Sequence, residues 1–203
     1  LTVNDVECRL LRCVLDMSKE GIMVDTKRRS EVSDILHRSY REALINFEEK
    51  YGELVNFNSG AELEHLFNRL GLPVEYTDKG NPSFNNAALL ASGDIGKEII
   101  HIKEIKTVMN NFVDGALVDF VCPDGRIHCN FYPAKKDDGG TITGRFACRY
   151  PNLQQIPAKK EKFGDEIRSI LVPNEGCWYG APDFKQVEYR VLSHFASGPG
   201  AED

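Results

Sequence analysis

Apolar side chains recur at intervals of three and four residues through the first 120 positions, which predicts a mainly helical region. A first helix is expected to end at Gly21. Asp25 then has the position of an N-cap for a longer helix that Gly52 closes. The apolar face expected for this longer helix consists of Val32, Ile35 or Leu36, Tyr40, Ala43, Leu44 and Phe47.

Two further helices are expected before residue 116. Ser59 and Glu62 have the spacing of a capping box, so a short helix is predicted to begin there and to end at Gly71. A turn-rich stretch follows, in which residues 79–82 (KGNP) require loop geometry. Helical periodicity then resumes over residues 95–112.

The pattern changes at about residue 116 to short apolar runs separated by turns. Residues 116–121, the turn at 123–125 (PDG) and residues 126–132 together predict a β-hairpin. A second strand is expected at residues 177–184, directly before a helix at 186–196. The sequence therefore predicts an α+β fold, in which a helical part precedes the start of an antiparallel sheet with a strand-helix motif.

The composition is that of a globular protein. The 203 residues are 41% hydrophobic and 28% charged, which suffices for one sizeable core. No apolar run approaches the roughly 20 residues of a membrane span, and the N-terminal residues lack the layout of a signal peptide. We therefore expect a soluble protein of the cytoplasm with no membrane partner.

The cysteines form no CxxC pair, and none has a histidine at metal-ligand spacing, which argues against a zinc site. We expect reduced and mostly buried thiols instead. The six are Cys8, Cys13, Cys122, Cys129, Cys148 and Cys177.

The net charge of −6 hides a basic segment. Residues 126–168 contain nine Lys or Arg against five acids, a local charge of +4, which leaves −10 for the remainder. Such a surface can follow the phosphates of a nucleic acid, although a solvated face is the commoner cause.

Two motifs are candidates for chemistry. The first is residues 143–157 (TGRFACRYPNLQQIP), where Arg145 follows a glycine and prolines flank a run of side-chain amides. Guanidinium and amide groups on rigid turns suit recognition of base edges in a minor groove, although a plain surface turn is the commoner explanation of Thr-Gly-Arg alone. The second is Asp183 in APDFKQVEYRVLSH, which either holds a divalent metal ion or caps the following helix.

Taken together, these motifs closely resemble the family A DNA polymerases, especially those of phages. The resemblance extends over nearly the whole chain and is sharply specific at residues 143–194. It implies a helical thumb and its approach at residues 1–115 and the N-terminal part of a polymerase palm at residues 116–203. It further implies a DNA-directed DNA polymerase that adds deoxynucleotides to a primer 3′ end by two-metal phosphoryl transfer.

The resemblance also assigns roles to residues. Asp183 and the carbonyl of Phe184 would bind Mg²⁺, of which the reaction uses two ions. Glu188 would be catalytic and lie against the sugar of the incoming deoxynucleoside triphosphate, which Gln186 would also contact. Contacts to primer-template DNA would come from Arg145, Asn152, Gln154, Gln155 and Lys159. His128, Arg168, Arg190 and His194 match family positions too, with a structural role at least as well supported for each.

Some features depart from the family pattern. Lys185 stands where the family usually has Ser, and residues 146–148 (FAC) replace Leu-Ser-Ser. The fingers, the rest of the palm and the second metal-binding aspartate would follow Asp183 in the family, and the sequence stops at Asp203. We therefore expect a fragment that is inactive by itself.

Three alternatives stay open from the sequence. The first is a non-catalytic duplex-DNA-binding module derived from a polymerase, which shares the basic segment. The second is a single-subunit RNA polymerase, against which Glu188 and the PNLQQIP run argue. The third is an unrelated α+β structural protein.

Overall fold

The computed structural model describes residues 3–132, 141 and 145–196. The chain forms two compact units, Leu1–Val172 and Pro173–Asp203. The first unit contains seven α-helices in its described residues, together with a π-helix (η1, Met109–Ala116) and a 3₁₀ turn (η2, Leu153–Gln155). The α-helices are α1 (Val3–Glu20), α2 (Thr26–Tyr51), α3 (Gly60–Arg69), α4 (Asn86–Ala91), α5 (Asp94–Val108), α6 (Leu117–Asp119) and α7 (Gly164–Arg168).

The long helix α2 has the ends that its sequence predicts. The side chain of Asp25 accepts a hydrogen bond of 2.9 Å from the backbone N–H of Arg28, which satisfies one of the unpaired donors of the first turn. At the other end Gly52 adopts a left-handed conformation (φ 84°), and its N–H donates to the carbonyl of Glu48. Both predicted boundaries of this helix are confirmed.

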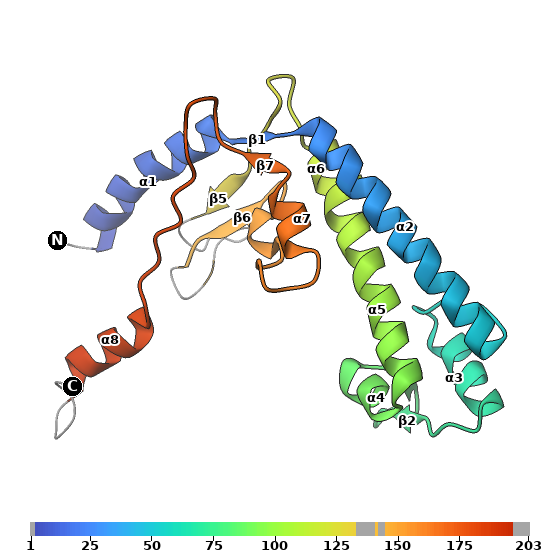
Figure 1. Ribbon diagram of the computed structural model, residues 1–203. Helices are drawn as coiled ribbons and strands as arrows, with labels where there is room; N and C mark the ends of the chain where they lie inside the picture. The colour runs from blue at the N-terminus through green and yellow to red at the C-terminus, as the bar shows by residue number, and fades with distance from the viewer. Residues whose placement is uncertain (1–2, 133–140, 142–144, 197–203) are drawn as a thin grey trace. The chain divides into compact units, whose positions relative to one another are not determined.

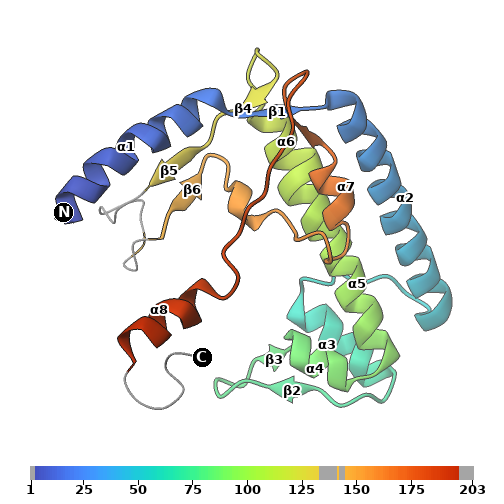
Figure 2. The same cartoon turned by 60° about the vertical axis from the view of Figure 1, so that its left-hand side comes forward.

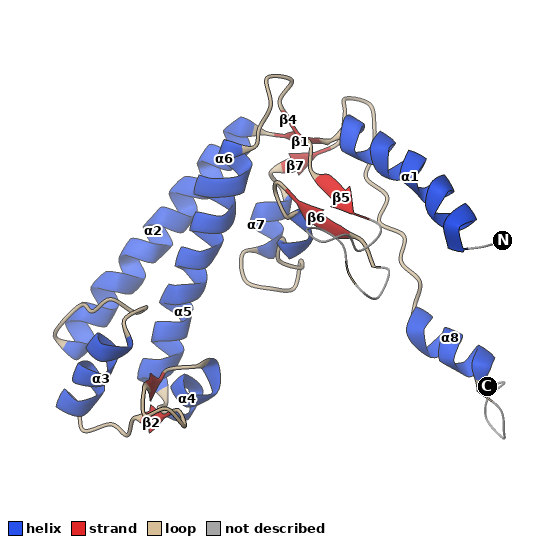
Figure 3. Cartoon of the chain, turned by 180° about the vertical axis from the view of Figure 1, so that it is seen from behind, coloured by secondary structure: helices blue, strands red, loops and turns tan. Residues whose placement is uncertain are grey.

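Helices α2 and α5 lie side by side, and η1 continues α5 along α2 (Figures 1 and 3). The apolar face of α2 runs through the fully buried Leu36, whereas Ile35 is 41% exposed. α3 and α4 lie at the end of this helical pair that is remote from β1 (Ile22–Val24) (Figure 1). The predicted helix at residues 95–112 is confirmed, but its last turns are a π-helix.

Two hydrophobic clusters form the core of this unit. One lies around Phe47 and Leu66 where α2, α3 and α5 meet. The other joins Leu36 of α2 to Ile127 and to Ile167 of α7, so that helices and strands share it. Burial of about twenty apolar side chains in this way supplies the main driving force for folding.

The turn-rich stretch before α4 contains a small hairpin that the sequence did not predict. β2 (Glu75–Tyr76) pairs antiparallel with β3 (Pro82–Ser83) around the predicted turn at Gly80. α4 follows, capped by the side chain of Asn85, which accepts from the N–H of Ala88 at 2.9 Å.

The remaining strands form two antiparallel sheets. In the three-stranded sheet, β1 lies between β4 (Arg126–Ile127) and β7 (Leu171–Val172). In the two-stranded sheet, β5 (Asn130–Tyr132) pairs with β6 (Ala147–Arg149), and β5 lies beside α1 (Figure 2). The α+β class and the antiparallel pairing are confirmed.

The predicted hairpin at residues 116–132 is wrong in its first strand. Leu117 lies in α6 and is 1% exposed, because its side chain continues the packing of η1 against the core. Only Val121 bridges to Ile127, and β4 takes β1 as its partner instead. A short apolar run fits a buried helical turn as well as a strand, which explains the error.

The predicted strand at residues 177–184 is also wrong. This segment of the second unit has no regular secondary structure. The predicted helix after it is confirmed as α8 (Val187–Phe195). None of the helices in the described part of the chain combines the length and the hydrophobicity that a membrane span needs.

The expectation of mostly buried thiols is wrong as well. Cys129 and Cys148 are buried, and the other four cysteines are exposed. Burial raises the pKa of the Cys129 thiol to about 12. Its neighbour Cys148 lies in β6, the strand that pairs with β5.

Candidate functional site

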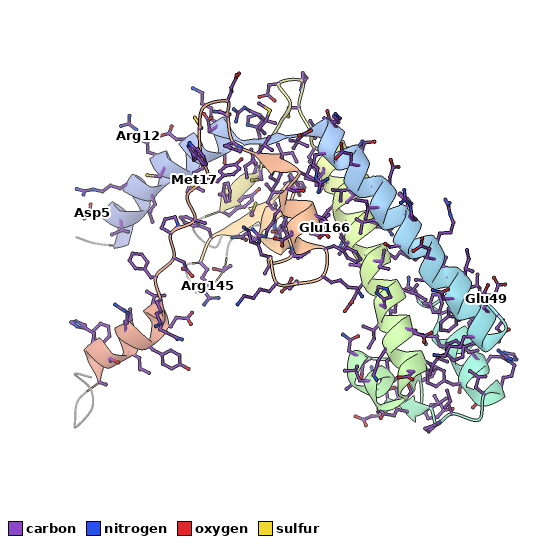
Figure 4. The ribbon with its side chains drawn as sticks, viewed as in Figure 1. Asp5, Arg12, Met17, Glu49, Arg145 and Glu166 are labelled. Carbon is purple, nitrogen blue, oxygen red and sulfur yellow. The ribbon has the colours of Figure 1, made fainter. Side chains whose placement is uncertain are left out.

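The first candidate motif surrounds β6. Thr143 and Gly144 lie outside the described residues. Arg145 is exposed just ahead of β6, and its backbone carbonyl accepts a hydrogen bond of 2.7 Å from the hydroxyl of Thr141 (Figure 4). The guanidinium is therefore presented at the surface next to an anchored backbone.

The amide side chains of this motif hold the turn that carries them. The carboxamide oxygen of Asn152 accepts from the backbone N–H of Gln154 at 3.1 Å, which caps η2. The amide nitrogen of Gln154 donates to the carbonyl of Phe146 at 3.0 Å. Gln155 and Lys159 are exposed. Asn152 and Gln154 therefore order the motif, and their solvent-exposed edges remain accessible.

Arg168 and His128 have the structural roles that the sequence left open. The Nε of Arg168 donates to the carbonyl of Pro157 at 2.7 Å, which ties the end of the motif to α7. His128 lies between the carbonyl of Ser18 and the carboxylate of Asp124, each 2.9 Å from a ring nitrogen. The Asp124 hydrogen bond, followed by the one to Ser18, raises the pKa of His128.

The basic segment divides into structural and surface cations. Arg126 donates to the carbonyl of Glu20 at 3.0 Å, and Lys162 contacts His101 and lies 3.7 Å from the carboxylate of Glu104. Burial, followed by the charge of Lys162, lowers the pKa of His101. Lys135 and Lys136 lie outside the described residues. The exposed cations of the described segment include Arg145, Arg149, Lys159 and Lys160.

The second candidate motif lies in the other unit. Asp183 and Phe184 are in a segment without regular secondary structure, and Phe184 is 80% exposed. Gln186 has a left-handed backbone (φ 55°) and precedes α8, and Glu188 lies in the first turn of that helix. Residues 183–188 form one short, exposed segment in which Asp183 and Glu188 carry carboxylates.

Oxygen donors of this kind suit magnesium. Mg²⁺ prefers carboxylate and carbonyl oxygens, and the Asp183 carboxylate and the Phe184 carbonyl are both of that type. In the part of the chain that the structure describes, Asp183 belongs to no cluster of three or more possible ligands. The residues therefore fit a magnesium ion in kind and supply only part of its ligands.

A family model described as "DNA polymerase family A" matches residues 26–200, which include both motifs. The chain belongs to DNA polymerase family A.

The relatives of this family A chain include phage and bacterial enzymes. It is 28% identical over 214 residues to "DNA polymerase DpoZ" of Acinetobacter phage SH-Ab 15497, covering 96% of this chain and 34% of the phage protein. It is 30% identical to "DNA polymerase I" of Geobacillus stearothermophilus, covering 96% of this chain and 22% of that protein. The chain thus spans about a third or less of these relatives.

A solved structure has the same fold. The polymerase domain of Pol1 from M. smegmatis, in complex with DNA primer-template and dNTP, matches with a TM-score of 0.76 and 26% sequence identity. The match covers 93% of this chain and 33% of that one. The arrangement of helices and short antiparallel strands is therefore shared with a polymerase domain.

Sequence reasoning missed one group of side chains. The ligand atoms of Cys122, Asp124 and His128 lie within 4.8 Å of one another. The group contains a single cysteine, so it has no CxxC pair that would mark it in the sequence. The available signal was the spacing Cys-x-Asp-x₃-His around a Pro-Asp-Gly turn.

Proposed function

We propose that this chain forms the thumb (residues 1–115) and the N-terminal part of the palm (residues 116–203) of a DNA-directed DNA polymerase. The whole protein would add deoxynucleotides to a primer 3′ end on a DNA template during DNA replication. The observation that carries this proposal is the family A match over residues 26–200, because it includes both candidate motifs in their expected order.

Primer-template DNA is the proposed partner of the first motif. Arg145, Gln155 and Lys159 are exposed on the unit Leu1–Val172, and charged or amide side chains in such positions suit phosphates and minor-groove edges. Asn152 and Gln154 would contribute mainly by ordering the turn, since both already hydrogen-bond within it. The related Pol1 domain carries DNA primer-template, which supports this assignment.

Deoxynucleoside triphosphates are the proposed substrates at the second motif. Asp183 and the Phe184 carbonyl would hold magnesium, and other groups of the whole protein would complete the two-ion site. Magnesium held by these groups would supply positive charge that neutralises the transferred phosphoryl group. Glu188 would lie against the sugar, Gln186 would contact the nucleotide, and Lys185 would add a cation near the triphosphate. This reaction belongs in the cytoplasm of a bacterial or phage-infected cell, where both substrates are present.

The test is Asp183→Ala in the whole polymerase that contains this chain. Primer extension is expected to fall by at least about a hundredfold, because a metal ligand acts on the transition state. Affinity for primer-template, measured by fluorescence anisotropy, is expected to stay within about twofold, because many phosphate contacts supply it.

The matched control is Glu175→Ala, which removes another exposed carboxylate from the same segment and should leave extension unchanged. An Asp183→Ala enzyme with extension close to wild type would refute the metal assignment. A wild-type protein that binds primer-template and never extends it would favour the duplex-binding module instead.

A further inference from the structure

We propose that Cys122, Asp124 and His128 form a zinc-binding site, with three protein ligands and a fourth position open to water. One Sγ, one carboxylate oxygen and one imidazole nitrogen lie within 4.8 Å of one another at this place. All three residue types are zinc ligands, and tetrahedral coordination separates ligand atoms by roughly 3.3–3.8 Å. Shifts of about an ångström would therefore complete the site.

The turn that carries two of these ligands is firmly built. The N–H of Gly125 donates to the carbonyl of Cys122 at 2.9 Å, and Gly125 has φ 78°, which favours glycine. The N–H of Cys122 donates to the carbonyl of Arg126 at 2.8 Å. The carbonyl of Gly125 also accepts from the N–H of Val24 in β1 at 3.0 Å. Cys122 and Asp124 are thus presented from a closed turn that is attached to the sheet.

Asp124 offers one oxygen to the site. Its Oδ1 accepts from the backbone N–H of Arg126 at 3.0 Å, which orients the carboxylate. Its Oδ2 faces the Nε2 of His128 at 2.9 Å. A ligating carboxylate held by a second hydrogen bond in this way is pre-oriented for a metal ion.

His128 is oriented in the same manner. Its Nδ1 lies 2.9 Å from the carbonyl of Ser18 in α1, and because a carbonyl only accepts, Nδ1 carries a hydrogen. A histidine that binds a metal ion through one ring nitrogen usually donates a hydrogen bond from its other ring nitrogen in this way. The Nε2, which faces the Asp124 carboxylate, is then the ring nitrogen that would bind a metal ion.

The donor set selects the metal. A thiolate and an imidazole suit Zn²⁺ and are poor ligands for Mg²⁺, so this site differs from the magnesium site proposed at Asp183. The guanidinium of Arg126 is the nearby charge that opposes a cation. It already donates to the Glu20 carbonyl and lies 3.5 Å from the Glu20 carboxylate, which offsets its charge.

The experiment uses the full chain, reduced and freed of metal with a chelator that is then removed. Titration with Co²⁺ is expected to produce a near-ultraviolet thiolate-to-cobalt absorption band at one equivalent. Zn²⁺ should abolish this band, and a large excess of Mg²⁺ should leave it in place. Isothermal titration then measures the affinity for Zn²⁺ directly.

Variants identify the ligands. Cys122→Ser should remove the cobalt band and weaken Zn²⁺ binding more than about 100-fold, because loss of a ligand exceeds the effect of loss of a supporting group. Asp124→Asn should weaken it at least about tenfold. Cys177→Ser is the matched control, since Cys177 is an exposed thiol outside any such cluster of described residues.

Cys122→Ser with unchanged Zn²⁺ affinity, or a wild-type chain that gives no cobalt band, would overturn the proposal. Cys122 is exposed, so its replacement by serine leaves the core intact, and circular dichroism checks this. Metal binding is measured without nucleotide addition, so failure here leaves the Asp183 assignment untouched, and the reverse also holds.

Discussion

The two polymerase motifs of this chain differ in how they are held. The motif around β6 is tied by hydrogen bonds from Gln154 to Phe146 and from Arg168 to Pro157, within a unit that has two buried clusters. The motif at Asp183 lies in the unit Pro173–Asp203, where every described side chain from 174 to 196 is exposed. A motif can therefore be recognised from the order of its residues whether or not its side chains are packed in a core.

The helices α2 and α8 show the same difference in the burial of their apolar side chains. α2 buries Val32, Leu36 and Phe47, all at 0% exposure. α8 has an equally regular apolar face, yet Leu192 and Phe195 are 64% and 80% exposed. An apolar stripe stabilises a fold only when another element covers it.

The largest expected difference in stability is between two Phe→Ala substitutions, one in each region. Phe47→Ala should destabilise the chain by about 3–5 kcal/mol, because it empties a fully buried site between the rings of Tyr51 and Phe57. Phe195→Ala should change the free energy of unfolding by no more than about 0.5 kcal/mol. Chemical denaturation of both variants measures this. Equal losses of unfolding free energy would show that α8 is packed in solution, which would contradict the difference between the two regions.

Glu188→Ala should separate function from stability in the exposed motif. In the whole polymerase, incorporation of ribonucleotides relative to deoxynucleotides is expected to rise at least about a hundredfold, because the side chain would exclude a 2′-hydroxyl. If Glu188 only complements the N-terminus of α8, its loss costs about 0.3–1 kcal/mol of stability and leaves the sugar preference unchanged. Single-nucleotide incorporation assays decide between the two, with Glu175→Ala as the matched control.

Asp25→Ala and Asp183→Ala compare one residue type in the two regions. Loss of the Asp25 cap, which accepts from Arg28 N–H at 2.9 Å, should cost about 0.5–2 kcal/mol in thermal or chemical unfolding. Asp183→Ala should leave unfolding within about 0.5 kcal/mol of wild type. A destabilised Asp183→Ala chain would mean that this carboxylate supports structure.

The smallest effect expected is a pH dependence from the His128 and Asp124 pair. The pKa of His128 is raised, chiefly by Asp124, so its contribution is present below its ordinary value of 6.5 and is lost as pH rises through the raised pKa. The pKa of Asp124 is lowered, chiefly by His128, so its contribution is lost as pH falls through that lowered pKa. The pair therefore stabilises the chain between these two pKa values.

Melting temperatures of wild type and Asp124→Asn, measured against pH with a chelator present, test this. Asparagine keeps an acceptor for the Arg126 N–H, so the comparison isolates the charge. The difference between the two proteins should shrink as pH rises above the raised pKa of His128. Asp78→Asn, in the exposed turn between β2 and β3, is the control. A constant difference across this range would show that the pair is not charged.

Local sequence by itself determined the longer helices and the motifs. Asp25 and Gly52 bound α2, Ser59 caps α3, and α8 follows its apolar spacing, because helical hydrogen bonds and caps join residues at most a few positions apart. The order of residues in 143–194 likewise determined the polymerase resemblance before any coordinates, since it depends on residue identity alone.

Only the tertiary structure decided the strand pairing and the cluster at Cys122. Met23 pairs with both Arg126 and Val172, and His128 meets Ser18 across 110 positions of the chain. Strands of two or three residues are too short to show a period of two, and their partners are set by which distant segments the buried clusters bring together. The apolar run at 116–121 contains the helix α6 because Leu117 packs into the buried cluster around Leu36. The run at 177–184 has no regular secondary structure.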